Sequence, residues 1–131
     1  MRRGRTDPQV LCDTRALVGA PPVPAGVLWK LTESGRQLDA NVIRLAPGDR
    51  ITSHCEPHLD VLLLIVSGDG GLGKGPSEKP EPLTGGTLLR LPHGSTRSIT
   101  AGGSGLASLT AHSRRPGMRI QSRANTSPAQ P

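Results

Sequence analysis

The chain has 131 residues with one Trp, no Phe and no Tyr, which fits one domain whose core is built from Leu, Val, Ile and Ala. Its formal charge of +6 is confined to the ends, since residues 6–113 hold nine Lys and Arg against ten Asp and Glu. A body of this kind lacks the basic face and the stacking aromatics of nucleic-acid-binding domains, which argues against nucleic acid as a partner.

The ends of the chain differ in composition from its middle. Residues 1–9 and 122–131 are polar and predict disordered tails on either side of one domain over residues 10–121. Residues 10–18 fit a short helix or an edge strand, and a proline-rich linker follows over residues 20–25.

Short apolar or alternating runs separated by turn residues predict seven strands. They are Val27–Leu31, Leu38–Leu45, Arg50–Cys55, Val61–Ser67, Thr87–Leu91, Thr96–Thr100 and Leu106–His112, with residues 118–120 as a candidate edge strand. Residues 74–86 hold three prolines without alternation and predict a loop. Many short strands with regular turns are typical of a sandwich or barrel and not of βαβ units.

The run Val61–Val66 is apolar at every position, so both faces of this strand need cover. One face lines the interior of the predicted barrel. The other must pack against the N-terminal segment, residues 10–31, or against a partner subunit. An apolar face of this kind is typical of an interface, and we therefore predict a homodimer.

Two spaced motifs carry a family resemblance. In the first, five residues separate Gly48 from His54, and Gly68 closes the strand that follows. In the second, five residues separate Gly86 from Pro92, and Gly94 comes two residues later. In these spacings the chain resembles the cupin superfamily. The resemblance implies an all-β, single-domain fold, the double-stranded β-helix or jelly-roll cupin barrel.

The residues at the family's metal-ligand positions are mostly changed. In cupins two His, one Glu and a last His converge inside the barrel on a divalent metal such as Fe, Mn, Ni or Zn. Here His54 keeps the first position, but Glu56, Val61 and Arg97 occupy the other three, with Asp60 one residue before Val61. A guanidinium cannot ligate a metal and repels a divalent ion unless an acid neutralises it.

The first hypothesis for function is a metal-free binding module without a cofactor. It would hold a small polar or anionic molecule in the barrel. The ligand-binding candidates are His54, Glu56, Arg97, His112 and Asp60. An inward Arg97 is expected to pair with Glu56 and His54, because an unpaired buried charge is costly; the alternative is a solvated Arg97 at the barrel mouth.

The alternative hypothesis is a metal-dependent enzyme with oxygenase- or isomerase-like chemistry. The segment H-C-E-P-H offers His54, Glu56 and His58 as ligands for a divalent transition metal. A third possibility is that the barrel serves only as a dimerisation platform. No apolar run has the length of a signal-peptide core or a membrane span, and with two cysteines but no metal-type pair we predict a cytoplasmic protein.

Overall fold

The structure, a computed structural model, describes residues 7–19 and 24–114, and of residues 52–55 it describes the backbone only. Within this part of the chain, one short helix and seven strands are present. They are α1 (Thr14–Gly19), β1 (Gly26–Lys30), β2 (Leu38–Leu45), β3 (Arg50–Cys55), β4 (Val61–Gly73), β5 (Glu81–Thr84), β6 (Leu88–Leu91) and β7 (Thr96–Ser113). All strand pairs are antiparallel, which confirms the predicted all-β architecture in one small domain.

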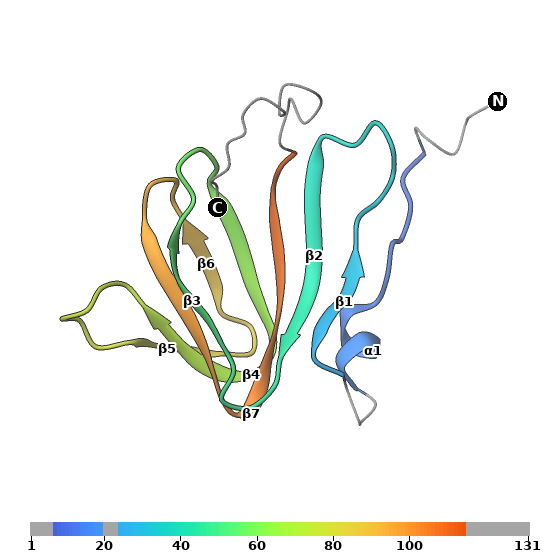
Figure 1. Cartoon of the computed structure of the whole chain (residues 1–131). Helices are drawn as coiled ribbons and strands as arrows, with labels where there is room; N and C mark the ends of the chain where they lie inside the picture. Colours follow the sequence, from blue (N-terminus) through green and yellow to red (C-terminus); the bar gives the residue numbers. More distant parts are fainter. Residues whose placement is uncertain (1–6, 20–23, 115–131) are drawn as a thin grey trace.

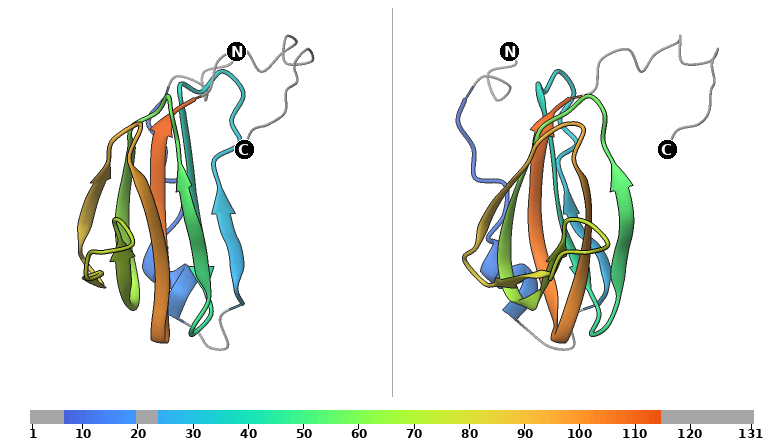
Figure 2. Two further views of the ribbon diagram at one scale, coloured as in Figure 1. Left: turned by 60° about the vertical axis from the view of Figure 1, so that its left-hand side comes forward. Right: turned by 90° about the vertical axis from the view of Figure 1, so that its left-hand side faces the viewer.

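The two long strands β4 and β7 organise the barrel (Figure 1). The first half of β7 pairs with β3 and its second half with β2. In the same way, the first half of β4 pairs with β6 and its second half with β5. Because β4 and β7 also pair with each other while bending, the strands curl around one interior, as the two views of Figure 2 show. This is the two-sheet arrangement of a jelly roll.

Three of the predicted strand assignments differ from the structure by more than one residue, and glycine explains two of them. The prediction ended a strand before Gly68 and divided residues 96–113 into two strands, whereas β4 runs on to Gly73 and β7 is continuous. The register of β4 against β7 shifts between Ile65 and Ser67 and again after Gly68, whose φ is 88°. Glycine here forms bulges that bend a strand without ending it.

The third error concerns the segment predicted as a loop. The strand β5 lies inside it and pairs with β4. Its Leu83 is 1% exposed, so one buried side chain anchors this strand. The anchoring holds although Pro80 and Pro82 lie just before Leu83 in the sequence. The predicted edge strand at residues 118–120 and most of the predicted tails lie outside the described residues.

The first half of β4 alternates in burial although it is apolar throughout. Val61, Leu63 and Ile65 face the core and are at most 7% exposed, whereas Leu62 is 50% exposed. They pack with Leu72 from the second half of β4 and with inward side chains of the neighbouring strands: Leu83, Leu91, Ile99, Ala101 and Leu106. The interior of the barrel is therefore aliphatic on the side that β4 provides.

The opposite side of β4 carries an outer apolar face, which consists of Leu62, Leu64, Leu88, Leu109 and Ala111. Register places these side chains together, because Leu62 lies opposite Ala111, and Leu64 lies opposite both Leu88 and Leu109. The helix α1 contacts β4, but Leu62 and Leu88 remain 50% and 62% exposed. Cover by the N-terminal segment is thus only partial.

We expect this outer apolar face to join two copies of the chain. Leu62→Asp should convert a dimer into a monomer, since a charge in an apolar interface loses its hydration without a partner. Light scattering after size exclusion at micromolar concentrations measures the mass. The control is Val10→Asp, because Val10 is 94% exposed and does not belong to the outer apolar face. A monomeric mass for the unchanged chain would reject the homodimer.

Candidate functional site

The barrel holds a cavity of about 230 Å³ between its two sheets, which is partly open to solvent. Half of its lining is aliphatic: Ile43, Ile51, Val61, Leu63, Leu91 and Ile99. The other half is polar: Asn41, Glu56, Arg97, Ser98, Thr110 and His112. The polar residues come from β2, from both halves of β7 and from the turn after β3, so the cavity wall is assembled from segments far apart in the sequence.

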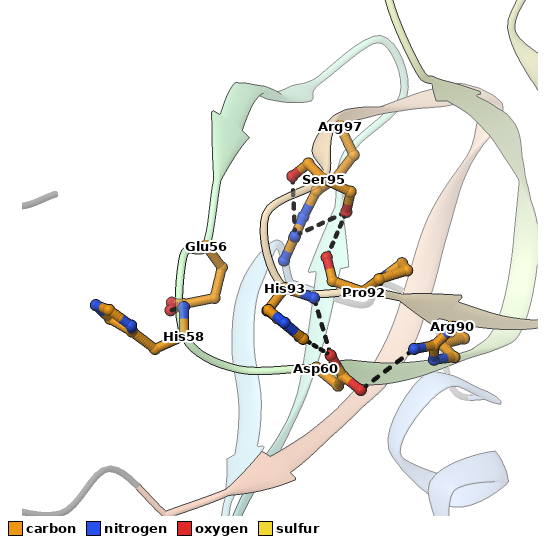
Figure 3. Close-up of polar contacts among 8 residues, drawn as sticks. All are labelled: Glu56, His58, Asp60, Arg90, Pro92, His93, Ser95 and Arg97. Atoms are coloured by element: carbon orange, nitrogen blue, oxygen red, sulfur yellow. Dashed lines mark hydrogen bonds and ion pairs between the residues drawn. The ribbon is translucent and has the colours of Figure 1, made fainter.

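Arg97 is the charged residue that the fold buries most deeply among those described, at 6% exposure. It lies in β7 opposite His54 of β3 and lines the cavity. Its Nη1 donates to the carbonyl oxygen and the hydroxyl of Ser95 over 3.4 and 3.5 Å, which are long contacts, and its Nε has no acceptor (Figure 3). The expected inward position is therefore observed, and the solvated alternative is not.

The expected ion pair between Arg97 and Glu56 is not observed. None of the ion pairs between described side chains joins these two residues. Glu56 is half-buried and lines the cavity, and its Oε2 accepts the backbone N–H of His58 at 3.0 Å. Figure 3 shows this carboxylate turned to the side of His58 and away from the guanidinium. Arg97 thus keeps its charge inside the barrel without an acidic partner among the described side chains.

The predicted histidines divide between the cavity and the surface. His112 lines the cavity, and its Nδ1 lies 2.8 Å from the carbonyl oxygen of Ser113. A carbonyl only accepts, so Nδ1 donates this hydrogen bond, and in the neutral ring Nε2 is then the acceptor nitrogen. His58 is exposed and does not line the cavity, which separates it from Glu56 as a metal ligand. The side chain of His54 lies outside what the structure describes.

Asp60, a predicted site residue, lies on the outside of the barrel. It accepts the backbone N–H of His93 at 2.9 Å, contacts Nδ1 of the same residue at 2.6 Å, and pairs with Arg90 at 3.4 Å. These contacts, the backbone N–H of His93 first, lower the pKa of Asp60 to about 2. No pattern in the sequence indicates this cluster, because the turn that holds His93 reaches Asp60 only in three dimensions.

No family model matches this chain, and no curated protein matches its sequence. Solved structures do. Protein TT1209 from Thermus thermophilus superposes with a TM-score of 0.63 at 19% identity, over 81% of this chain and 98% of its own. An uncharacterized protein with a double-stranded β-helix domain from Klebsiella pneumoniae gives 0.61 at 16% identity, over 81% of this chain and 90% of its own.

A third match is a sugar phosphate isomerase of the cupin superfamily from Silicibacter pomeroyi, with a TM-score of 0.55 at 20% identity, over 62% of this chain and 53% of its own. This chain has the cupin fold. Identities of this size show the fold and no activity. The resemblance predicted from Gly48, Gly68, Gly86 and Gly94 is therefore confirmed for the fold.

The residues at the cupin metal positions do not fit a metal. Val61 is buried at 7% exposure and lines the cavity, but its side chain has no donor atom. Arg97 brings a permanent positive charge to the same wall. Among the side chains described, no group of three or more His, Cys, Asp or Glu is close enough to hold an ion.

We expect the purified protein to contain well under one equivalent of Fe, Mn, Ni or Zn. Two of the four cupin ligand positions, Val61 and Arg97, lack a donor, and the cation at the second repels a divalent ion. Inductively coupled plasma mass spectrometry of protein prepared without added metal measures the content. Stoichiometric metal that is lost in the His54→Ala variant would contradict the expected metal-free protein. The metal-dependent enzyme would then be the favoured hypothesis.

Proposed function

We propose that this cupin-fold protein is a metal-free binding module that holds a small anion on Arg97 inside the barrel. The observation that carries the proposal is that Arg97 is only 6% exposed, with two long hydrogen bonds and no acidic partner among the described side chains. Arginine is rarely buried without a partner, and an unpaired buried charge destabilises the fold. An anionic ligand would supply the missing partner.

The remaining polar groups of the cavity suit recognition better than chemistry. His112 offers an acceptor nitrogen, and Thr110 offers a hydroxyl. A few polar groups on a largely aliphatic wall are typical of small-molecule sites. The expected cytoplasmic location belongs to this proposal, in agreement with the free thiol of Cys12.

Anion binding is tested by calorimetry with acetate, butanoate and inorganic phosphate. The unchanged protein should bind at least one of them, and Arg97→Gln should weaken that binding at least about tenfold, since charge-assisted hydrogen bonds are the strong ones. Arg97→Lys, which keeps the charge but loses the planar fork, should be intermediate. The matched control is Arg90→Gln, an exposed arginine outside the cavity, which should bind as the unchanged protein does. Equal binding by the Arg97 and Arg90 variants would reject the proposal.

The alternative is a metal-dependent, oxygenase- or isomerase-like enzyme. Two observations favour it: His112 and Glu56 line the same cavity, and the Silicibacter protein of this fold is named a sugar phosphate isomerase. An enzyme of this kind requires a set of metal ligands other than the family's. The metal content of the purified protein decides between this alternative and the metal-free binding module. If neither anion nor metal binds, the dimerisation platform is the hypothesis that remains.

A further inference from the structure

We propose that the ligand of the barrel is a short aliphatic hydroxycarboxylate, whose carboxylate binds Arg97 and whose hydroxyl donates to Asn41. The proposal rests on the proposed function, anion binding by Arg97, and adds the chemical class of the ligand. It is built from the charges of the cavity wall, its unpaired polar atoms, and its size.

The charges of the wall favour a monoanion. Arg97 is the permanent cation among the described lining residues, and Glu56 brings a carboxylate to the same wall. A phosphate dianion would bring two negative charges to one guanidinium, which leaves it undercompensated. A carboxylate carries one charge and matches the planar fork of a guanidinium with two oxygens.

The polar atoms of the cavity wall that lack a partner indicate a ligand with both a hydrogen-bond donor and an acceptor. Two buried side-chain polar atoms lack a partner in the described part of the chain, Nε of Arg97 and Oδ1 of Asn41, and both residues line this cavity. The first is a donor and the second an acceptor. Asn41 lies in β2 opposite Thr110 of β7, and its amide turns easily about its last torsion. Oδ1 has almost no exposed surface where it lies, so the amide has to turn toward the cavity to accept a ligand hydroxyl while the carboxylate binds Arg97.

The volume of the cavity and its aliphatic lining indicate the size and polarity of the ligand beyond its carboxylate and hydroxyl. A cavity of about 150 Å³ holds benzene, so on that scale the 230 Å³ of this barrel hold about nine non-hydrogen atoms. The aliphatic half of the wall, from Ile43 to Ile99, packs on CH₂ groups and has no aromatic ring on which a base or sugar ring could stack. A four-carbon hydroxy acid fits inside this volume, whereas a nucleotide would extend out of it.

The test compares butanoate with 2-, 3- and 4-hydroxybutanoate on the unchanged protein and on Asn41→Leu, by calorimetry. At least one hydroxy acid should bind the unchanged protein about tenfold more tightly than butanoate, because a site that hydrogen-bonds a hydroxyl rejects the analogue without it. In Asn41→Leu the ratio between the affinities for that hydroxy acid and for butanoate should fall below about threefold.

A hydroxyl advantage that is absent, or that persists in Asn41→Leu, overturns the ligand class. If butanoate still binds and Arg97→Gln abolishes that binding, anion binding stands without the hydroxyl contact. If no carboxylate binds the unchanged protein but phosphate does, the ligand class fails and anion binding stands; if none of these anions binds, the proposed function itself fails. Should Asn41→Leu not fold, the ¹⁵N side-chain amide signal of Asn41 gives the answer in the unchanged protein: it should move with the hydroxy acid and not with butanoate, and equal shifts contradict the proposal.

Discussion

Arg97→Met should raise the free energy of unfolding of the ligand-free protein by about 1–3 kcal/mol and abolish anion binding. Replacing buried charge with an apolar side chain of similar volume is often stabilising, because the guanidinium no longer has to be desolvated. Met keeps the packing of the aliphatic stem of Arg97 against the cavity wall. For a domain of this size each kcal/mol corresponds to about 4–8 °C in melting temperature, which calorimetry or circular dichroism resolves.

With the ligand bound, the unchanged protein should be more stable than Arg97→Met. A carboxylate at a hundred times its Kd adds about 2.7 kcal/mol to the unchanged protein and nothing to the variant. Arg90→Met, at an exposed arginine on the outside of the barrel, is the control and should change stability by less than about 0.5 kcal/mol. The charge of Arg97 is thus expected to cost stability and to serve binding, a trade-off typical of functional sites.

A loss of about 3–5 kcal/mol in Arg97→Ala and Glu56→Ala would contradict this account, because that is the cost of breaking a buried pair. The double variant would then be clearly more stable than the two losses added together predict. Such a result would show that Glu56 turns toward Arg97 in solution. Additive losses of a few tenths of a kcal/mol each would instead indicate a solvated arginine and favour the dimerisation platform.

The elements that depend on local sequence could be predicted. The strands Leu38–Leu45 and Arg50–Cys55 have the bounds that their composition indicated. The strand β5 and the continuity of β7 could not be predicted, because pairing across the barrel decides whether a proline- or glycine-rich segment is extended. Pairing partners far apart in the chain leave little trace in composition.

The candidate site divides in the same way. The inward positions of Val61 and Arg97 follow from the cupin spacing, which fixes the turn and the face of each strand. Asn41 and Thr110 were missed, although they lie opposite each other on the same wall. A polar residue at an alternating position of a strand ordinarily indicates a solvent-facing side, and only the closed barrel shows that this side encloses a cavity. The absence of an acidic partner for Arg97 among the described side chains likewise depends on rotamers that no spacing determines.

The glycine spacing of the first motif should prove essential for folding and not for binding. Gly68 lies at the bulge of β4 with a φ of 88°, and a Cβ there would overlap the carbonyl oxygen of Gly105 and lie 2.9 Å from Cα of Leu106. Both obstacles are backbone atoms of β7, so neither can move aside without disturbing the pairing of the two longest strands. We expect Gly68→Ala to lose more than about 4 kcal/mol, a large share of the roughly 5–15 kcal/mol that stabilise an ordinary domain.

Substitutions at two further glycines distinguish the two causes of the expected loss in Gly68→Ala, backbone strain and steric overlap. Gly86 has a φ of 93° but open space where a methyl group would lie, so Gly86→Ala carries backbone strain alone and should cost about 1–2 kcal/mol. Gly75 has neither a positive φ nor a neighbour within 4 Å, so Gly75→Ala should stay within about 0.5 kcal/mol of the unchanged protein. Urea unfolding followed by circular dichroism ranks the three. If Gly68→Ala loses no more than Gly86→Ala, β4 and β7 do not approach as closely at this bulge as the structure shows, and the spacing from His54 to Gly68 then reflects turn geometry alone.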